Sequence, residues 1–451
     1  MPEGRTNRLI MTVLFCMLVL LPFAAIAQDV SPAAVVTPAG TALAKIDSGD
    51  TAWVLVSTAL VMLMTPGLAM FYGGMVRRKN VLGTIMHSFI AIALVSVQWI
   101  LFGYSLAFGP DVNGFIGNLS WAGLGNVGLT PNADYAPTVP HLAFMIYQMM
   151  FAVITPALIS GAFAERIKFS SFLLFTVVWT TIVYDPVAHW VWGAGGWLKN
   201  LGVLDFAGGI VVHATSGFSA LAAALYIGKR KGFLQEHMPP HDLPMTVLGA
   251  GLLWFGWFGF NAGSALSSGS LATMAFVTTH TAAVSATLTW TFAEWIHRGK
   301  PTMFGAATGA IAGLATITPA AGFVGPMPAL FIGMAAGVLC YIALNAKTRF
   351  KYDDSLDAFG VHGVGGTLGT IMAGVFASVA INAAGANGLL FGNPKQLAVQ
   401  IGAVALVAVY SFVVSIGLFK IIDMVIGIRV DAEQETEGLD ISQHGEAGYT
   451  H

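Results

Sequence analysis

Long apolar segments recur along most of this chain, and they restrict its fold more than any other feature of the sequence. A helix needs about 20 apolar residues to cross the hydrocarbon layer of a bilayer. Eleven segments of this kind follow residue 50, at residues 51–72, 80–106, 139–163, 169–188, 206–228, 244–264, 271–296, 302–319, 325–346, 357–379 and 396–427. Only 9% of the residues are charged, against about 25% in soluble domains. The sequence therefore predicts an all-α polytopic membrane protein with eleven transmembrane helices, and it excludes a cytosolic enzyme or a nucleic-acid-binding protein.

The first 27 residues have the pattern of a cleavable signal peptide. Two arginines precede an apolar stretch at residues 9–23, and Ala25-Ile26-Ala27 forms an A-x-A cleavage signal. The alternative is a further transmembrane helix, for which the apolar stretch is short. We predict cleavage after residue 27, which leaves residues 28–50 as an outer N-terminal segment before the membrane domain at residues 51–427.

The distribution of basic residues predicts the orientation of the helices, because cytoplasmic connections are enriched in Lys and Arg. With the N-terminus outside, alternate connections become cytoplasmic, and they hold Arg77, Arg78, Lys79, Arg166, Lys168, Lys229, Arg230, Lys231, Arg298, Lys300, Lys347, Arg349 and Lys351. The outer side of the mature chain holds Lys45, Lys199 and Lys395. We therefore predict that the N-terminus lies outside and the C-terminus inside.

The C-terminal tail, residues 428–451, differs in composition from the membrane domain. Its acidic residues are Asp431, Glu433, Glu435, Glu437, Asp440 and Glu446, and no Lys or Arg follows Arg429. An acidic run of this kind is usually a solvated and disordered end, and we expect that here. A regulatory or docking segment is the alternative.

Two stretches that resemble each other suggest an internal repeat. One begins at Asp205 and reaches His213, and the other begins at Asp357 and reaches His362. The stretches lie five spans apart, so the second enters the bilayer from the opposite side. Inverted repeats have this property, and their interface near the midplane commonly forms a transport site.

His213 and His362 are the candidates for a functional pair inside the membrane, where polar side chains are costly. Two neutral imidazoles can share one proton through an N–H···N bond, which suits a small neutral molecule or a transferred proton better than a bare cation. The alternative is two structural histidines bonded to backbone carbonyls. The chain has no HExxH or CxxC motif, so we expect neither a metal site nor a cofactor.

Aromatic and small polar residues gather near the predicted outer ends of several spans. They include Tyr147, Gln148, Phe151, Trp192, Trp254, Trp257, Phe258, Phe260, Asn261 and Ser264. Such a group forms either an interfacial aromatic belt or a trap for an ammonium-type cation, since an aromatic face attracts cations. Composition does not choose between these interpretations.

Several motifs resemble those of the ammonium transporter family (the Amt/Mep/Rh group), most closely its bacterial Amt branch. The resemblance covers the chain from about residue 51 to its end. The motifs are Phe71-Tyr72-Gly73-Gly74, Ala164-Glu165-Arg166, Ala188-His189 with Trp192-Gly193, Asp205-Phe206-Ala207-Gly208-Gly209 with His213, the run from Gly256 to Ser264, Gly360-Val361-His362-Gly363, and Gly427-Ile428-Arg429-Val430 in the tail.

The resemblance implies an eleven-helix fold with an inverted five-plus-five repeat, and a homotrimer in the cell inner (plasma) membrane with one pore in each subunit. It also implies a role for each candidate site residue: Trp192 and Ser264 in an outer cation site, Phe151 and Phe260 in a stacked gate below it, His213 and His362 as twin histidines in the pore, Gln148 in the gate region, and Asp205 as an acid that acts through structure and electrostatics. Tyr147 stands where many relatives have Phe. In such proteins a trimeric PII signalling protein can dock on the inner face.

The function that we predict is the recruitment of ammonium outside, its deprotonation near the gate, and conduction of ammonia past the twin histidines. An apolar path penalises any bare ion heavily, so potassium, which cannot lose a proton, would be excluded. The proton is returned outside or carried separately. The main alternative is an ammonium sensor that signals through its C-terminal tail. A channel for another neutral solute and an intramembrane enzyme are more distant alternatives, and we expect no enzymatic activity.

Overall fold

The computed structural model describes residues 45–449, so the predicted signal peptide and most of the outer N-terminal segment lie outside the described residues. Within residues 45–449, ten helices are long and apolar enough to cross a membrane. The eighth predicted segment forms α12 (Met303–Ile317), an apolar helix of 15 residues that is shorter than the others. The chain is therefore a multi-pass, mostly helical membrane protein, as its apolar segments predicted.

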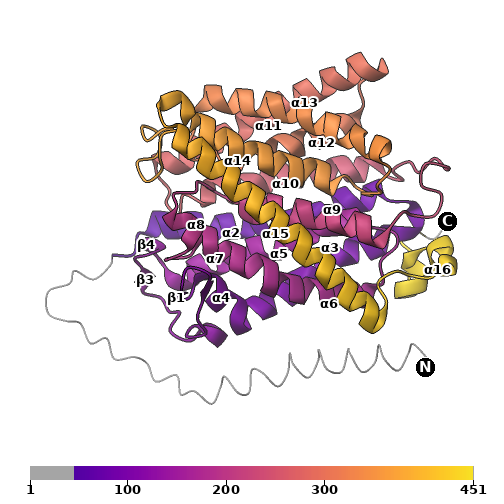
Figure 1. Ribbon diagram of the computed structural model, residues 1–451, viewed down its shortest axis with the longest axis horizontal. Helices are drawn as coiled ribbons and strands as arrows, with labels where there is room; N and C mark the ends of the chain where they lie inside the picture. The colour runs from indigo at the N-terminus through magenta and orange to yellow at the C-terminus, as the bar shows by residue number, and fades with distance from the viewer. Residues whose placement is uncertain (1–44, 450–451) are drawn as a thin grey trace.

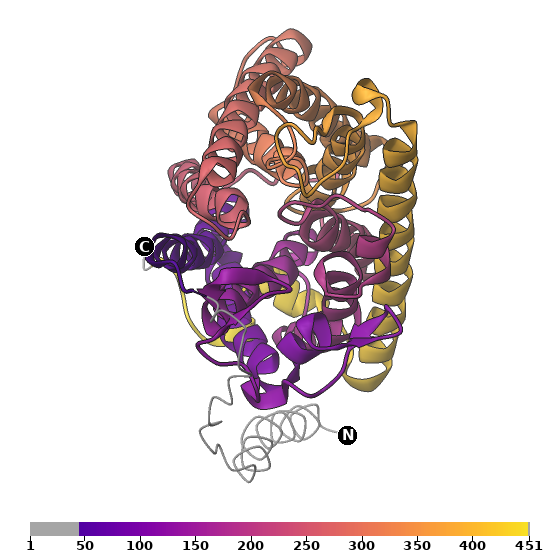
Figure 2. The same cartoon turned by 90° about the vertical axis from the view of Figure 1, so that its left-hand side faces the viewer.

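The long helices follow the predicted segments closely. In chain order they are α2 (Ser48–Met75), α3 (Val81–Gln98) continued by α4 (Tyr104–Phe108), α5 (His141–Phe163), α6 (Phe169–Trp179) continued by α7 (Asp185–Trp192), α9 (Thr215–Ile227), α10 (Leu243–Gly263), α11 (Ser270–Arg298), α12, α13 (Pro326–Phe350), α14 (Val364–Phe376) and α15 (Pro394–Ile426). These helices lie side by side in one bundle (Figure 1), and Figure 2 views the bundle from one end. The last long helix, α15, lies along one side and contacts α6, α9 and α14.

Four of these spans contain a π-helical turn. The turns are η2 (Trp99–Gly103), η4 (Thr180–Tyr184), η5 (Gly209–Ala214) and η6 (Phe359–Gly363). Such turns are rare and are often found at functional sites. Here η5 leads into α9 and η6 leads into α14. In addition, η5 contacts α14 and η6 contacts α9.

The connection at residues 109–138 lies at one end of the bundle, which we call the hairpin end (Figure 1). It forms two small antiparallel pairs, β1 (Asp111–Val112) with β2 (Ile116–Gly117), and β3 (Pro131–Asn132) with β4 (Ala136–Pro140). The buried His189 ring holds this connection, with Nε2 at 2.9 Å from Asp111 Oδ1 and Nδ1 at 3.0 Å from the Ala107 carbonyl oxygen. This motif residue therefore anchors the connection at the hairpin end.

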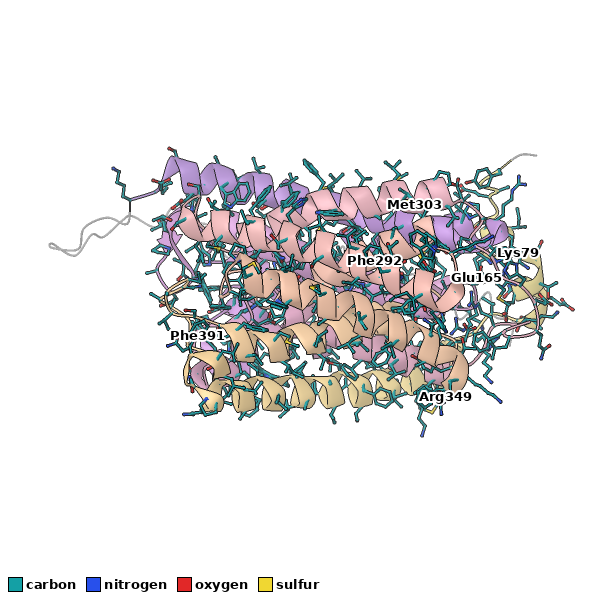
Figure 3. All side chains as sticks on the ribbon, turned by 90° about the horizontal axis from the view of Figure 1, so that it is seen from above. Lys79, Glu165, Phe292, Met303, Arg349 and Phe391 are labelled. Atoms are coloured by element: carbon teal, nitrogen blue, oxygen red, sulfur yellow. The ribbon has the colours of Figure 1, made fainter. Side chains whose placement is uncertain are left out.

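The opposite end of the bundle, which we call the tail end, holds an ion-pair network. Figure 3 shows Lys79, Glu165 and Arg349 toward this end and Phe391 toward the other. The buried Glu165 carboxylate accepts hydrogen bonds from Arg77 and Arg230, and Arg230 pairs with Asp353 at 2.9 Å.

Charge in this network outweighs desolvation at Glu165. Burial alone would raise the pKa of Glu165, yet the guanidinium charges of Arg230 and Arg77 hold that pKa below its usual value. Removing one charged side chain from a buried ion pair leaves the charge of the other uncompensated. The network therefore ties together four of the five connections that were predicted to share one side of the membrane.

The C-terminal tail is folded, and our expectation of a disordered acidic end is wrong for its described part. It forms α16 (Ala432–Glu437) and the π-helical turn η8 (Asp440–His444). The Glu435 carboxylate accepts hydrogen bonds from Arg429 and from the Lys231 backbone, and Asp440 accepts one from Gly83 N at 2.8 Å. Individual acidic side chains meet specific donors at the tail end, which a composition count does not reveal.

Candidate functional site

The predicted histidine pair meets in the middle of the bundle. His213 on η5 and His362 on η6 are both buried, and their Nδ1 atoms lie 3.2 Å apart. The two rings are nearly parallel, at 16° with centroids 5.2 Å apart. A bond between two Nδ1 atoms requires one ring to donate and the other to accept, so the two imidazoles adopt different tautomers when both are neutral. The two histidines therefore bond to each other and do not lie apart, while their role in function stays a prediction.

The twin histidines line one narrow apolar cavity. We call it the central cavity, and its lining residues are Met64, Leu68, Phe71, Ile154, Leu158, Val212, His213, Leu253, Trp257, Phe260, Ile311 and His362. His213 Nε2 is buried and has no hydrogen-bond partner. Within this apolar lining the imidazoles supply the polar groups, so a passing molecule would find a donor and an acceptor but no fixed charge.

Two phenylalanines lie between His213 of the central cavity and Trp192. The Phe151 and Phe260 rings lie 4.3 Å apart at 36°, and both are almost fully buried. Phe260 also lies against His213 at 6.0 Å, and Phe151 lies edge-on to Trp192 at 5.9 Å. The predicted gate residues are therefore in contact, and in this structure they leave no open path between them.

A second cavity of about 510 Å³ opens above this phenylalanine pair. Its lining, which we call the vestibule, comprises Phe108, Asp134, Tyr135, Phe144, Gln148, Trp192, Lys199, Phe206, Ser264 and Leu266. Three predicted substrate-binding residues, Trp192, Gln148 and Ser264, thus come together from α7, α5 and the end of α10. Asp134, Tyr135 and Lys199 were missed, because they belong to connections whose folding no periodic pattern signals.

The Ser264 hydroxyl is oriented by its neighbours. It donates to the Phe260 carbonyl at 2.9 Å and lies 3.1 Å from the Tyr147 hydroxyl. Tyr147 itself is fully buried and is 2.9 Å from the Gly259 and Phe260 carbonyl oxygens. Because the serine O–H donates its hydrogen bond to a carbonyl, a lone pair of the serine oxygen remains free to accept a hydrogen bond from a cation in the vestibule. The Tyr147 hydroxyl therefore supports this serine and does not stand free in the vestibule.

Asp205 acts on the backbone. Its carboxylate accepts hydrogen bonds from four consecutive N–H groups, those of Gly208, Gly209, Ile210 and Val211, at 2.6 to 3.1 Å. These are the unpaired donors at the start of η5, the turn that carries His213. The Asp205 carbonyl also accepts from Trp192 Nε1 at 2.8 Å. One residue thus positions both the vestibule tryptophan and the first of the twin histidines.

The counterpart of Asp205 on the other turn is Asp354, and not Asp357 as the sequence echo suggested. Asp354 accepts from the backbone N–H groups of Ala358 and Phe359 at the start of η6. It stands eight residues before His362, as Asp205 stands eight before His213. Asp357 instead pairs with Lys347. The equal spacing was readable in the sequence, but the nearer acid concealed it.

Burial affects the two equivalent carboxyls alike. It raises the pKa of Asp205 to about 6, and burial together with the nearby Asp357 raises the pKa of Asp354 to about 6. Each carboxyl accepts hydrogen bonds from the N–H groups at the start of its turn, where a negative charge is favourable.

A third cavity, of about 1400 Å³, opens at the tail end. Arg230, Glu294, Lys347 and Asp357 are among its lining residues. The three cavities therefore differ in character: the vestibule is aromatic and polar, the central cavity is apolar with two imidazoles, and the cavity at the tail end carries charge of both signs.

Comparison with known proteins gives consistent matches over nearly the whole chain. The family model described as Ammonium Transporter Family matches residues 52–449. The ammonium transporter of Bacillus subtilis (strain 168) is 53% identical over 402 residues, which cover 89% of this chain and 98% of that protein. The crystal structure of Candida albicans Mep2 has a TM-score of 0.83 and 36% identity, covering 90% of this chain and 91% of that one. A solved Sensor Amt Protein has a TM-score of 0.81 and 30% identity, covering 88% and 98%.

Proposed function

The chain belongs to the ammonium transporter family, and on this premise we propose that it takes up ammonium across the cell inner membrane and conducts it as ammonia. The observation that carries the mechanism is the contact between the twin histidines inside one apolar cavity, behind a closed pair of phenylalanines. A cation would have to shed its hydration to enter this cavity, and few groups there could replace it. A neutral molecule with one lone pair and N–H donors meets matching partners on the imidazoles.

Recruitment occurs in the vestibule. Ammonium differs from potassium of the same charge because it donates hydrogen bonds, and the free lone pair of Ser264 and the side-chain oxygen of Gln148 accept them. Gln148 Oε1 is buried without a partner, which leaves it available. The face of Trp192 adds a cation–π attraction of about 0.5–2 kcal/mol. Together these groups prefer an ammonium-type cation over a neutral solute, which needs no such site.

Deprotonation takes place at or just below Phe151 and Phe260. Ammonia then passes His213 and His362, and the proton is returned outside or moves separately along the imidazole pair. The hydrogen bond between the two rings supports such a relay, because a proton can be handed from one Nδ1 to the other. Potassium has no neutral form and stays in the vestibule.

The topology that we propose has eleven crossings, with α12 included, an inverted five-plus-five repeat, an outer N-terminus and an inner C-terminus. The ion-pair network supports it, since Glu165 reaches partners on other predicted inner connections. At the hairpin end, Asp50 in the first turn of α2 reaches Thr138 and Ser268 on two predicted outer connections. The equivalent capping of η5 by Asp205 and of η6 by Asp354 supports the repeat. Cleavage of residues 1–27 remains part of this proposal.

We also propose that three copies associate, each with its own pore. His280 lies mid-way along α11 with its side chain exposed, against Trp254 at 5.5 Å. A polar ring that faces hydrocarbon is costly, and a second copy would cover it. A PII signalling protein on the tail end is the proposed regulatory partner, and the folded tail at residues 428–449 supplies a surface there.

Purified protein in liposomes tests the mechanism, with ammonium uptake and electrical current recorded together. We expect uptake driven by an ammonium gradient and no current from potassium alone. His213→Ala and His362→Ala should lose flux or ammonium selectivity while they remain folded. Potassium currents as large as those of ammonium would refute deprotonation, and full selective flux in a folded double variant would refute the role of the histidines.

The alternative function is an ammonium sensor, and the structural similarity to the Sensor Amt Protein is the observation in its favour. Uptake of labelled methylammonium discriminates, because a pure sensor takes up none.

A further inference from the structure

The vestibule already contains an ammonium group that belongs to the chain itself. Lys199 lies on α8 (Trp197–Asn200), a single turn between α7 and η5, and its side chain lines the vestibule together with Trp192, Gln148 and Ser264. Among the described residues no ion pair within 4.0 Å involves Lys199. The side chain therefore adds a positive charge to the vestibule, and the carboxyl of Asp134, which lines the same cavity, acts on Lys199 through its charge and without a close ion pair.

The contacts of Lys199 are of the kind that a free ammonium ion would make. Its Nζ donates to the Trp192 carbonyl oxygen at 3.2 Å and lies 5.8 Å from the centroid of the Tyr135 ring. One carbonyl acceptor and one aromatic face are the partners that a small alkylammonium ion prefers.

The surroundings hold this lysine at the vestibule edge. Tyr135 is fixed by a hydrogen bond from its hydroxyl to the Phe108 carbonyl at 2.7 Å and by stacking on Phe144 at 4.9 Å. The turn that carries Lys199 is fixed by Asn200, whose Nδ2 donates to Gly195 O at 2.9 Å. The ring and the turn that face each other are both anchored, so the Lys199 charge stays close to the substrate site.

We propose that Lys199 sets the affinity of the vestibule for ammonium, because its tethered positive charge repels the incoming cation. The proposal rests on the proposed function and adds a residue that determines affinity. Lys199 is a positioning and electrostatic group here, and it takes no part in the deprotonation step.

The expected size of the effect follows from Coulomb's law. Two like charges about 8 Å apart, in surroundings between water and a protein surface, change a binding constant about two- to sixfold. Neutralising Lys199 should therefore lower the half-saturating methylammonium concentration by that factor. The maximal rate should stay unchanged, because the gate and the twin histidines are untouched.

The experiment measures initial rates of labelled methylammonium uptake by the full-length protein, in cells that lack their own ammonium transporters. It compares wild type with Lys199→Gln and Lys199→Arg. The matched control is Lys395→Gln, which removes another predicted outer lysine, one that is exposed at the start of α15. We expect a lower half-saturating concentration of methylammonium for K199Q alone, and the wild-type value for K199R and K395Q.

Ionic strength separates a charge effect from a structural one. Raising the concentration of an impermeant salt screens exposed charges over about 10 Å, so the difference between K199Q and wild type should shrink. Three results would overturn the proposal. The half-saturating concentration of K199Q could equal or exceed that of wild type, its maximal rate alone could fall, or the difference in half-saturating concentration could stay the same when salt is added. Absence of uptake by wild type would instead refute the transport function itself, so the two failures are distinguishable.

Discussion

Alanine at position 217 would place a methyl group in the tightest backbone contact beside the twin histidines. Gly217 lies in the first turn of α9, and a Cβ there would be 2.0 Å from Gly363 N and 2.8 Å from the carbonyl carbon of His362. Ordinary contact begins at 3.4 Å, so the two backbones must separate by about 1.4 Å. The atoms that the methyl group would meet belong to the main chain of His362 and Gly363, so the clash cannot be relieved by rotating a side chain.

This separation acts directly on the site. Gly363 follows His362, and the two Nδ1 atoms are 3.2 Å apart. A displacement of about 1.4 Å takes this pair well beyond hydrogen-bonding distance, because N–H···N bonds weaken steeply past that range. Overpacking of this kind costs about 1–3 kcal/mol, so we expect a protein that still folds but has lost the contact between its imidazoles.

The assay combines thermal unfolding in detergent with ammonium uptake and potassium exclusion in liposomes. Gly217→Ala should unfold at a lower temperature and lose most of its uptake or its selectivity. Gly251→Ala in α10 is the matched control, since its Cβ would meet nothing within 4 Å, and a helical Gly→Ala change is expected to be neutral or stabilising. Wild-type flux and selectivity in Gly217→Ala would refute the close crossing of α9 and η6 as the basis of the site.

Three further predictions concern two residues beside the cavities and one in the ion-pair network. Asp205→Ala removes the acceptor of four buried N–H groups, each worth about 1–3 kcal/mol, so stability and uptake should both fall; a variant with wild-type unfolding temperature and uptake would contradict the capping role. Tyr147→Phe keeps the ring but removes a contact of Ser264, so half-saturation should weaken about two- to tenfold at an unchanged maximal rate; an unchanged half-saturation for methylammonium would count against it. Glu165→Gln should destabilise the protein by about 3–5 kcal/mol at pH 7. Because the pKa of Glu165 is lowered in the folded state, its stabilising contribution is complete at neutral pH and is lost as pH falls through the folded value. The difference in unfolding temperature between Glu165→Gln and wild type should therefore narrow on acidification below 4.5, the ordinary pKa of a glutamate. A constant difference down to about pH 3, well below the usual Glu range, would contradict this reasoning.

The part of the fold that depends on local sequence was predictable. A run of apolar residues long enough to cross a bilayer has one favourable conformation there, because hydrocarbon offers no partner for an unpaired backbone group. The segment predicted at 139–163 is α5, His141–Phe163, and the segment predicted at 271–296 is α11, Ser270–Arg298. The identities of the histidines, of Trp192 and of Ser264 as candidate residues also followed from the sequence and from the resemblance.

Other features depend on which residues meet across the bundle. Asp354 replaced Asp357 as the equivalent of Asp205 because the cap is made by whichever carboxylate reaches the free N–H groups of the turn. The acidic tail was expected to be disordered because composition counts charges, whereas Arg429 and the Lys231 backbone offer Glu435 specific donors.

The sequence alone thus determined that the chain makes a series of apolar helices and which polar residues lie within them, since both depend on the solvent that each segment requires. Tertiary structure decided that two imidazoles from distant segments touch, that a tyrosine hydroxyl lies against the vestibule serine, and that a lysine lines the vestibule. Distances between remote segments are set by helix crossings, and glycines such as Gly217 permit those crossings only in the folded bundle.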